Sequence, residues 1–356
     1  MALNMNTSVD EREFYSCDFP DLSITTTNEH IDISVLVNGR SALSTRYYAV
    51  NGMVNVRNLV PVIEQTMQQL QNPFCTVSIT ITDTYETISA SCQVLLCKAR
   101  CMSVDVNTFI TSSFLTTNFH RLVTMYEDDV LPFYIPGSGS YAVGAFKYNC
   151  LIRKADGTIV QYEWVSGRRL AYGVSNAAIS ASDIHHTCAL TYGTDCQLLS
   201  FTLTFDTRIC HFYILPCPAA KTFRFTNIFG CSEVVTLPTA TVSKLEPDYS
   251  EAMVDGKLLH YDIKHTRTYE EHTAQLFSGY MSWLEQFLTS SDIRIKLPDG
   301  RYADVLIKEY TFELSNAPGE ENALSFTWQF SDGKQTTYRH SIQTGIFTEQ
   351  YNSAFS

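Results

Sequence analysis

The sequence predicts a mainly β fold with α+β character, in which an N-terminal β-sandwich-like part precedes a C-terminal antiparallel sheet packed by one amphipathic helix. Three observations lead to this prediction. Segments such as 197–205 and 324–330 alternate apolar and polar residues, as half-buried strands do. Turn dipeptides such as Asn38-Gly39 and Asp255-Gly256 separate segments of this kind. The clearest helical spacing of apolar residues lies at 273–288.

The first part of the chain is expected to fold back on itself through tight turns. Strands are predicted at 24–37, 42–50, 53–57, 75–82 and 88–102. Asn38-Gly39 and Asn51-Gly52 supply two of the turns. Asn58 is expected to cap a helix that runs to Gln71, with Pro61 tolerated in its first turn.

The middle of the chain continues the strand pattern. A short helix is expected at 107–114, and the Gly- and Ser-rich stretch 136–140 is expected to be a flexible loop. Strands are predicted at 141–154, 158–165, 197–205 and 208–215. Many short strands at regular spacing favour a β-sandwich or a related assembly.

The stretch from Phe223 onward holds the most regular patterns in the sequence. Strands are predicted at 223–229, 259–269, 293–297, 302–314, 324–330 and 336–344. The helix at 273–288 has one apolar stripe, formed by Leu276, Tyr280, Trp283, Leu284, Phe287 and Leu288. This stripe is expected to pack against a sheet, and an exposed partner-binding helix is the alternative.

Three segments are expected in the domain organisation. Residues 1–22 form a polar N-terminal arm, which is expected to order against a neighbouring subunit. Residues 23–222 form a β-rich domain that is either one unit or two subdomains. Residues 223–356 form an α+β domain. This last boundary rests on the new strand pattern at 223 and on the absence of cysteine after Cys231.

Composition narrows the classes of function. The net charge is −12 and no Lys/Arg cluster occurs, which argues against nucleic-acid binding. No run approaches the roughly 20 apolar residues that a membrane span needs. The first residues lack the pattern of a signal peptide, so synthesis in a cytoplasm is expected. The 11 cysteines follow no metal-binding spacing, and reduced buried thiols are favoured over disulfides or a metal site.

Two short motifs contain residue types that occur in catalytic sites. His185-His186-Thr187-Cys188 contains the residue types of a Cys/His site, but such partners usually come from separate elements, and an ordinary loop-to-strand segment is favoured. Gly137-Ser138-Gly139 lacks the flanking pattern of a nucleophile elbow or a phosphate loop. The sequence therefore predicts no catalytic or cofactor-binding residues, no cofactor, and a protein that is not an enzyme.

Two groups of residues have side chains that can bind metal ions. Glu127, Asp128 and Asp129 have the oxygen ligands that a hard cation prefers, but no loop of alternating ligands follows, and a solvated acidic turn is favoured. His260, His265 and His272 lie close in sequence. His260 and His265 are expected on opposite faces of one strand, which argues against shared ligation. No metal residue is assigned.

Several short motifs resemble a known family. The segment Phe225-x-Asn227-x-Phe229-Gly230-x-x-Glu233 leads into a hairpin, and the Trp283-Leu284 helix, the strand with Val305 and Ile307, and the aromatic strand 326–330 follow. Near the N-terminus stand Val37-Asn38-Gly39, Tyr47-Tyr48 and Asn51-Gly52. This succession is similar to tail-associated structural proteins of phages and prophages of gut Bacteroidetes. The resemblance covers about half of the chain and implies a virion component without a catalytic role.

The expected function is that of a phage tail or baseplate structural protein that works by subunit assembly. Its expected partners are copies of itself and other virion proteins, and its expected place is the virion tail after synthesis in the bacterial host. Low charge with 20 Tyr and 21 Phe suits large subunit contacts. The alternative is a carbohydrate- or receptor-binding β-sandwich module, for which a host-surface glycan is the expected partner.

Overall fold

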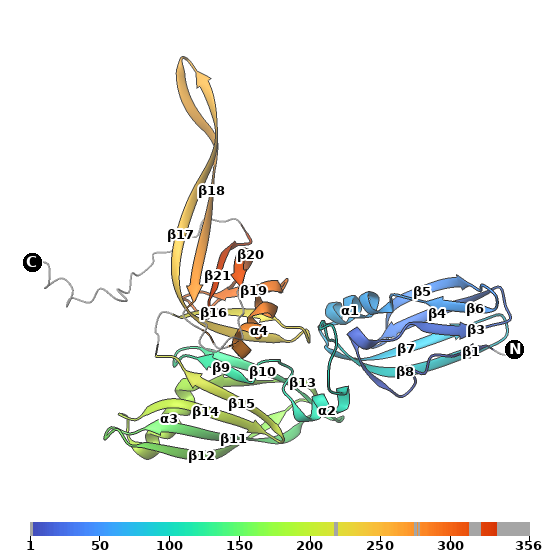
Figure 1. The fold of residues 1–356 in the computed structure, drawn as a ribbon, viewed down its shortest axis with the longest axis horizontal. Helices are drawn as coiled ribbons and strands as arrows, with labels where there is room; N and C mark the ends of the chain where they lie inside the picture. Colours follow the sequence, from blue (N-terminus) through green and yellow to red (C-terminus); the bar gives the residue numbers. More distant parts are fainter. Residues whose placement is uncertain (1–2, 217–219, 274–275, 277, 313–321, 333–356) are drawn as a thin grey trace, which may run out of the picture.

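Three hydrophobic cores are each formed by a separate stretch of sequence, and a fourth cluster combines residues from all three stretches. Figure 1 shows the three stretches as separate groups of strands. The structure is a computed structural model that describes residues 3–216, 220–273, 276, 278–312 and 322–332. The first core uses residues 3–96, the second residues 114–212 and the third residues 223–328. The fold is mainly β with α+β character, as predicted.

Two sheets enclose the first core. Its elements are β1 (Asn4–Met5), β2 (Glu13–Tyr15), η1 (Ser16–Asp18), β3 (Leu22–Thr25), β4 (His30–Val37), β5 (Arg40–Tyr48), β6 (Met53–Val56), α1 (Leu59–Leu70), β7 (Phe74–Thr82) and β8 (Thr87–Leu95). One sheet has the order β1-β3-β6 and the other β2-β8-β7-β4-β5. Asn38-Gly39 and Asn51-Gly52 form the predicted turns, with positive φ at all four residues.

The predicted N-terminal arm is wrong for the described residues. Leu3, Val9 and Phe19 are buried in the first core. β1 pairs with β3, and β2 pairs in parallel with β8. Backbone pairing holds a polar segment in place without a periodic apolar pattern, so the composition of this segment did not reveal that it is part of the sandwich.

The second core lies between a five-stranded sheet, a strand pair and a helix. The elements of this part are α2 (Val106–Ser112), β9 (His120–Val123), β10 (Asp128–Ile135), β11 (Ala142–Arg153), β12 (Ile159–Leu170), β13 (Gly173–Ser180), α3 (Ala181–Tyr192), β14 (Gln197–Phe205) and β15 (Arg208–Ile214). The sheet order is β12-β11-β14-β15-β9, and β10 pairs with β13. The expected short helix is present as α2, where the Asp105 side chain accepts from the Thr108 amide at 2.9 Å.

The third core is enclosed by a closed barrel and one helix. Its elements are β16 (Ala220–Thr226), β17 (Ser232–Val254), β18 (Lys257–Thr273), α4 (Ser278–Thr289), β19 (Ile293–Lys296), β20 (Tyr302–Phe312) and β21 (Leu324–Phe330). All pairings are antiparallel, in the order β16-β17-β18-β21-β20-β19. All six residues of the predicted stripe are buried in this core. Five of them lie on α4, whereas Leu276 precedes the helix. The predicted helix start at 273 is wrong, because Thr273 is the last residue of β18. The predicted strand at 336–344 lies outside the described residues.

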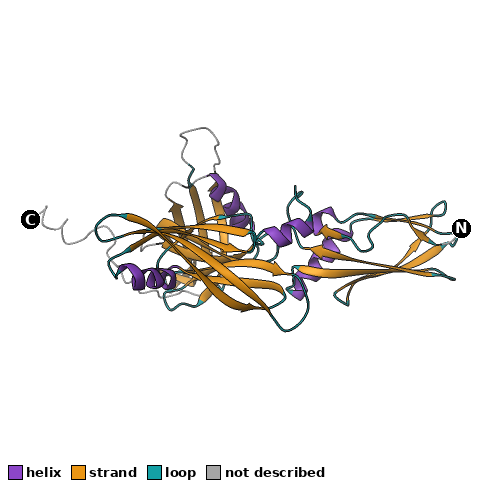
Figure 2. Cartoon of the chain, turned by 90° about the horizontal axis from the view of Figure 1, so that it is seen from below, coloured by secondary structure: helices purple, strands orange, loops and turns teal. Residues whose placement is uncertain are grey.

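Strands β17 and β18 extend far beyond the barrel as a two-stranded ribbon (Figure 1). The sequence predicted the Asp255-Gly256 turn, at which both residues have positive φ, but not the length of the strands. In Figure 2 the sandwich with the first core and the part with the other two cores lie side by side along the long axis. No helix in the described ranges is long and apolar enough to cross a membrane.

Candidate functional site

The loop 227–231 between β16 and β17 lies where the three parts of the chain meet. Phe229 and Cys231 are buried in a fourth apolar cluster, together with Tyr15 and Leu95 from the sandwich and Phe109 from α2. The Phe229 and Phe109 ring centroids are 5.1 Å apart. The amide of Lys98 donates to the carbonyl of Ile228 at 3.0 Å. This loop therefore connects the barrel to both other parts.

Asn227 fixes the shape of this loop. Its Oδ1 accepts from the amides of Phe229 and Cys231, both at 3.0 Å. Its Nδ2 donates to the carbonyl of Leu115 at 2.8 Å and to Glu233 Oε1 at 2.7 Å. An Asn side chain has two donors and an acceptor with two lone pairs, and here all of them have partners. One buried amide thus closes the loop and binds it to the middle part of the chain.

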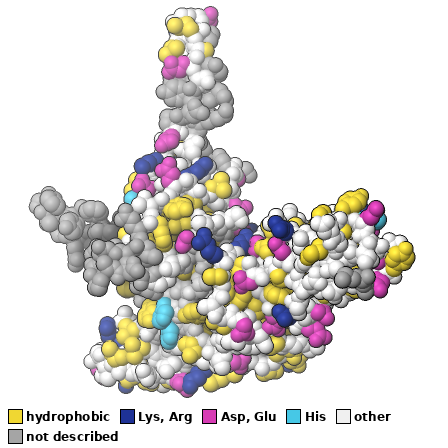
Figure 3. Space-filling model, turned by 45° about the vertical axis from the view of Figure 1, so that its right-hand side comes forward, with side chains coloured by type: hydrophobic (Ala, Val, Ile, Leu, Met, Phe, Trp, Pro, Cys, Tyr) yellow, Lys and Arg dark blue, Asp and Glu magenta, His cyan; other side chains and the backbone are white. Residues whose placement is uncertain are grey.

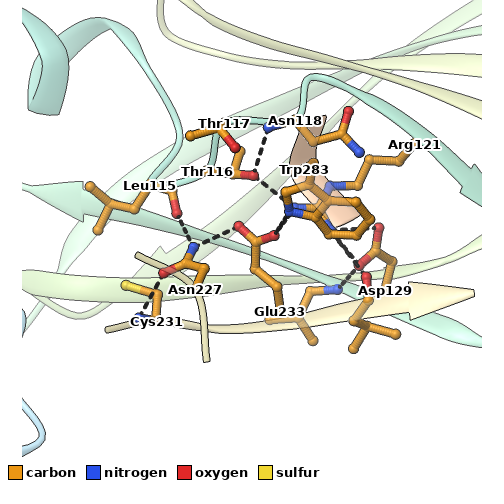
Figure 4. A network of polar contacts seen from close by, with 12 residues as sticks. Leu115, Thr116, Thr117, Asn118, Arg121, Asp129, Asn227, Cys231, Glu233 and Trp283 are labelled. Carbon is orange, nitrogen blue, oxygen red and sulfur yellow. Dashed lines mark hydrogen bonds and ion pairs between the residues drawn. The ribbon is translucent and has the colours of Figure 1, made fainter. Parts of the chain in front are cut away.

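A buried ion network continues from Glu233 (Figure 4). Arg121 of β9 lies 3.0 Å from Glu233 Oε2 and 3.1 Å from Asp129 Oδ1 of β10. Trp283 of α4 donates its indole N–H to Glu233 Oε2 at 2.5 Å, and its ring lies 4.9 Å from the Arg121 guanidinium carbon. Arg121 and Asp129 belong to the middle part, whereas Glu233 and Trp283 belong to the barrel. The network therefore spans the junction.

Burial sets the electrostatics of this network. Arg121 and Glu233 are 1% and 0% exposed at the side chain, so both charges are removed from water. Burial raises the pKa of Asp129 to about 6, although the Arg121 charge acts in the opposite direction. One cation, Arg121, thus pairs with two carboxyl groups. If both were ionised, the network would have a net charge of −1, and a proton on Asp129 would neutralise it.

We expect acid to favour folding at Asp129. Because the pKa of this carboxyl is raised from 3.8 to about 6 in the folded protein, the folded state binds more protons than the unfolded chain in this window. The stabilisation is fully present below about pH 4 and is lost as the pH rises through 6, with a size of about 1–3 kcal/mol. Asp129→Asn cannot bind this proton. Urea unfolding of the parent and of Asp129→Asn is measured from acid to neutral pH. The parent should lose stability relative to the variant as the pH rises through this window. A difference that does not change with pH would contradict the raised pKa of Asp129.

A second prediction concerns Gly230, the tightest point of the loop. Its φ is +69°, and a Cβ there would lie 2.5 Å from Leu96 Cδ2, a buried side chain of the sandwich. Gly230→Ala is expected to lower the free energy of unfolding by about 1–3 kcal/mol. Gly256→Ala is the matched control, because φ is +75° there and no atom lies within 4 Å. Equal losses in thermal unfolding of the two variants would show that the Leu96 contact contributes nothing.

The structure does not bring the predicted catalytic candidates together. His185-His186-Thr187-Cys188 lies within helix α3, so the expected loop-to-strand segment is wrong. The residues Ala181, Ile184 and Cys188 are buried at helical spacing, which is the signal that could have identified the helix. Cys188 contacts Cys150, and its hydrogen bond together with burial raises the pKa of Cys150.

His185 instead lies beside Cys196, at a cavity of about 460 Å³. The Cys196 sulfur is 3.9 Å from His185 Nε2, but this nitrogen is only 2.8 Å from the carbonyl oxygen of Cys196. A ring nitrogen that donates to a carbonyl has no lone pair with which to accept a thiol proton. Burial also raises the pKa of Cys196. This pair therefore has the contacts of a packed structural site and not those of an activated nucleophile.

The acidic group Glu127, Asp128 and Asp129 is also divided. Glu127 pairs with Lys296 of β19, whereas Asp129 points to Arg121. Within the described residues, no group of three or more His, Cys, Asp or Glu side chains is arranged to hold a metal ion. His272 bonds to Ser325 at 3.1 Å. Nothing is described for the side chains of His260 and His265, so their predicted opposite faces stay a prediction.

The remaining glycine-rich candidate is a support for an aromatic ring. In the loop Gly137-Ser138-Gly139, both glycines have positive φ and lie against the ring of Tyr172. A Cβ on Gly137 would lie 2.6 Å from Tyr172 Cε1. The sequence thus predicted the loop. Only the structure shows that the two glycines leave space for the Tyr172 ring.

Comparison with known proteins identifies no family. No family model and no curated protein matches the chain. Similar solved structures include CBD12 from CALX1.2 (8% identity, 58% of this chain and 79% of that chain, TM-score 0.19). A chimeric titin Z1Z2 tandem is 11% identical, with 60% of this chain and 98% of that chain covered and a TM-score of 0.19. A quinonprotein alcohol dehydrogenase-like protein from Bacteroides thetaiotaomicron is 11% identical, with 89% of this chain and 74% of that chain covered and a TM-score of 0.18. At these TM-scores the likenesses carry no argument.

Proposed function

We propose that this chain is a non-enzymatic structural protein of a phage tail or baseplate, made in the bacterial cytoplasm, which acts by assembly with copies of itself and with other virion proteins. The observation that carries this proposal is the β17–β18 ribbon. The short motifs that resemble tail-associated proteins support the virion setting. The buried network supports a structural role for the junction, because Arg121, Asp129 and Glu233 form ion pairs with one another.

The ribbon leaves two long strand edges without a partner in the described residues. β17 pairs with β16 only along residues 232–238 of β17, which lie opposite residues 220–226 of β16. β18 pairs with β21 only along residues 269–272 of β18. Beyond these pairings, the backbone pairing described for the two strands is with each other, up to Val254 and Lys257. From the cross-strand pair Lys244 and Thr268 to this end, the ribbon is roughly 35 Å long. A two-stranded ribbon is marginally stable alone, and open edges readily pair with other chains.

Apolar side chains are exposed at the end of the ribbon. Met253, Leu258 and Leu259 are 71%, 57% and 49% exposed, and Figure 3 shows apolar side chains gathered at this end. Met253 and Leu258 are directly opposite one another in the ladder. The ribbon points away from its own barrel (Figure 1), and no other described element lies over this end. Exposed apolar groups on an open edge favour association.

A second copy of the chain is the partner to which we assign the ribbon. The middle sheet ends in β12, a strand of 12 residues whose outer edge has no partner in the described part. A ribbon on one face and an open edge on another make a head-to-tail contact, which leads to rings or filaments. Such a contact places many identical subunits in one particle, as a tail or baseplate requires.

We expect removal of the ribbon to abolish self-association and leave the three cores folded. The variant replaces residues 244–268 by Asn-Gly, which joins Ser243 to Tyr269, an existing cross-strand pair, through a two-residue turn. Size-exclusion chromatography with light scattering should give an oligomer for the full chain and a monomer for this variant. Tryptophan fluorescence should be unchanged, since no Trp lies in the deleted segment.

Two point variants sharpen this test. Leu258→Ser removes an apolar side chain from the ribbon end and is expected to weaken association. Val50→Ser removes a 71% exposed side chain between β5 and β6, away from both proposed contact edges, and is expected to have no effect. A full chain that remains monomeric at all concentrations would overturn the assembly proposal. The virion setting has its own test, which is detection of the protein in purified particles and its location in a reconstruction.

A further inference from the structure

A polar groove lies at the junction, apart from the ribbon and its edges. Its wider lobe is a cavity of about 550 Å³ between the end of α1, the start of β13 and the loop 227–231. A narrower lobe of about 320 Å³ shares five of its lining residues, from Gln71 to Pro73 and at Gly230 and Ser232. Volumes of roughly 300–1,000 Å³ are typical of small-molecule sites. The groove exists only when all three parts of the chain are in place.

The chemistry of the wider lobe is neutral and rich in hydrogen-bonding groups. No Asp, Glu, Lys, Arg or His lines it. The side chains that supply its polar groups are Gln71, Asn72, Tyr134, Tyr172, Asn176 and Ser232. In the described part of the chain, the side chains of Gln71 and Asn176 and the hydroxyl groups of both tyrosines form no hydrogen bond with protein. These groups are therefore available to a ligand.

The two tyrosine rings are held in place before any ligand arrives. The backbone of Gly137 and Gly139 lies against the Tyr172 ring, as described above. The Tyr134 ring centroid is 4.6 Å from that of Phe74, and the Tyr134 carbonyl accepts from Arg208 Nη2 at 2.9 Å. Rings that are fixed in advance lose little conformational entropy on binding. Each side chain combines an apolar ring with a hydroxyl group.

We propose that the wider lobe of this groove binds a short segment of a neutral glycan. Sugar rings carry neighbouring hydroxyl groups, which pair with the donor and acceptor of an amide side chain such as Gln71 or Asn176. They also have C–H faces that pack on aromatic rings such as Tyr172. The absence of cationic side chains in the wider lobe disfavours anionic glycans and phosphorylated ligands, which need charged partners. This binding activity does not depend on self-association.

The test uses the full chain and a panel of soluble oligosaccharides. Saturation-transfer-difference NMR is recorded with maltohexaose, cellohexaose, mannohexaose and chitohexaose, and with a heparin hexasaccharide as the anionic probe. We expect transfer to at least one neutral oligosaccharide and none to heparin. Asn176→Ala removes an exposed amide from the groove and should weaken binding of that oligosaccharide about tenfold. Tyr172→Phe, which keeps the ring on the glycine loop, should weaken it by a smaller factor.

A matched variant and three outcomes that would overturn the proposal complete this test. Asn55→Ala removes an exposed amide of β6, which does not line the groove, and should leave binding unchanged. Transfer to no neutral oligosaccharide would overturn the proposal, and so would binding of heparin alone. Equal loss in the Asn55 and Asn176 variants would place the glycan elsewhere and would also overturn it. The Leu258→Ser variant should bind as the parent does, so failure here and failure of the assembly test are distinguishable.

Discussion

Replacing Arg121 by Met is expected to lower the free energy of unfolding by about 3–5 kcal/mol, the range for removing one partner of a buried ion pair. The variant leaves Asp129 and Glu233 without their cation, and both carboxyl groups are 5% exposed or less at the side chain. It also removes the cation from the Trp283 ring. Guanidinium unfolding followed by fluorescence measures the loss.

Two comparisons separate the buried charge from loss of an arginine in general. Arg46→Met breaks an ion pair with Asp32 in which both side chains are more than half exposed, and little change is expected there. Arg121→Met combined with Asp129→Asn and Glu233→Gln removes all three charges and should recover part of the stability. A single variant that loses less than about 1 kcal/mol would show that water reaches the network.

The second large effect is expected at Trp283. Trp283→Ala should cost about 3–5 kcal/mol, because this side chain is 1% exposed and packs against Tyr280 and Phe225 with centroid distances of 5.2 and 5.4 Å. Trp283→Phe keeps an aromatic ring and removes the N–H that Glu233 accepts. It should cost about 1–3 kcal/mol for an acceptor that loses a donor.

The comparison of these two variants separates packing from hydrogen bonding at one position. Tyr126→Ala is the control for truncating an aromatic ring, because Tyr126 is 78% exposed and its loss should change stability by less than about 0.5 kcal/mol. If Trp283→Phe matched the parent in urea unfolding, the hydrogen bond to Glu233 would contribute nothing. If Trp283→Ala lost less than about 1 kcal/mol, the helix would not be anchored by this ring.

Part of the candidate site could be read from sequence. The segment from Phe225 to Glu233 is recognisable in the sequence as a short motif. The structure places its residues Asn227, Gly230 and Glu233 at the junction. Their partners Arg121 and Asp129 were not predicted, because pairing between residues 112 positions apart leaves no local pattern. One signal was present: Arg121 stands in the short strand His120–Val123, where a buried charge requires a partner.

The domain boundary expected at residue 222 stays a prediction, to be tested by limited proteolysis, although the third core begins at Phe223. Sequence by itself determined the elements whose signals are local. The positive-φ turns at Asn38-Gly39 and Asp255-Gly256 and the buried stripe of α4 follow from neighbouring residues, because backbone sterics and side-chain periodicity act over a few positions.

Only the tertiary structure decided the features that depend on distant contacts. Closure of the C-terminal sheet into a barrel depends on β16 pairing with β19, some 70 residues along the chain. The incorporation of residues 3–22 into the sandwich depends on pairing with β3 and β8. The neutral wider lobe of the groove depends on three separate segments meeting at loop 227–231. Such contacts are fixed by which buried surfaces and strand edges fit together, and no short window of sequence contains both sides of the fit.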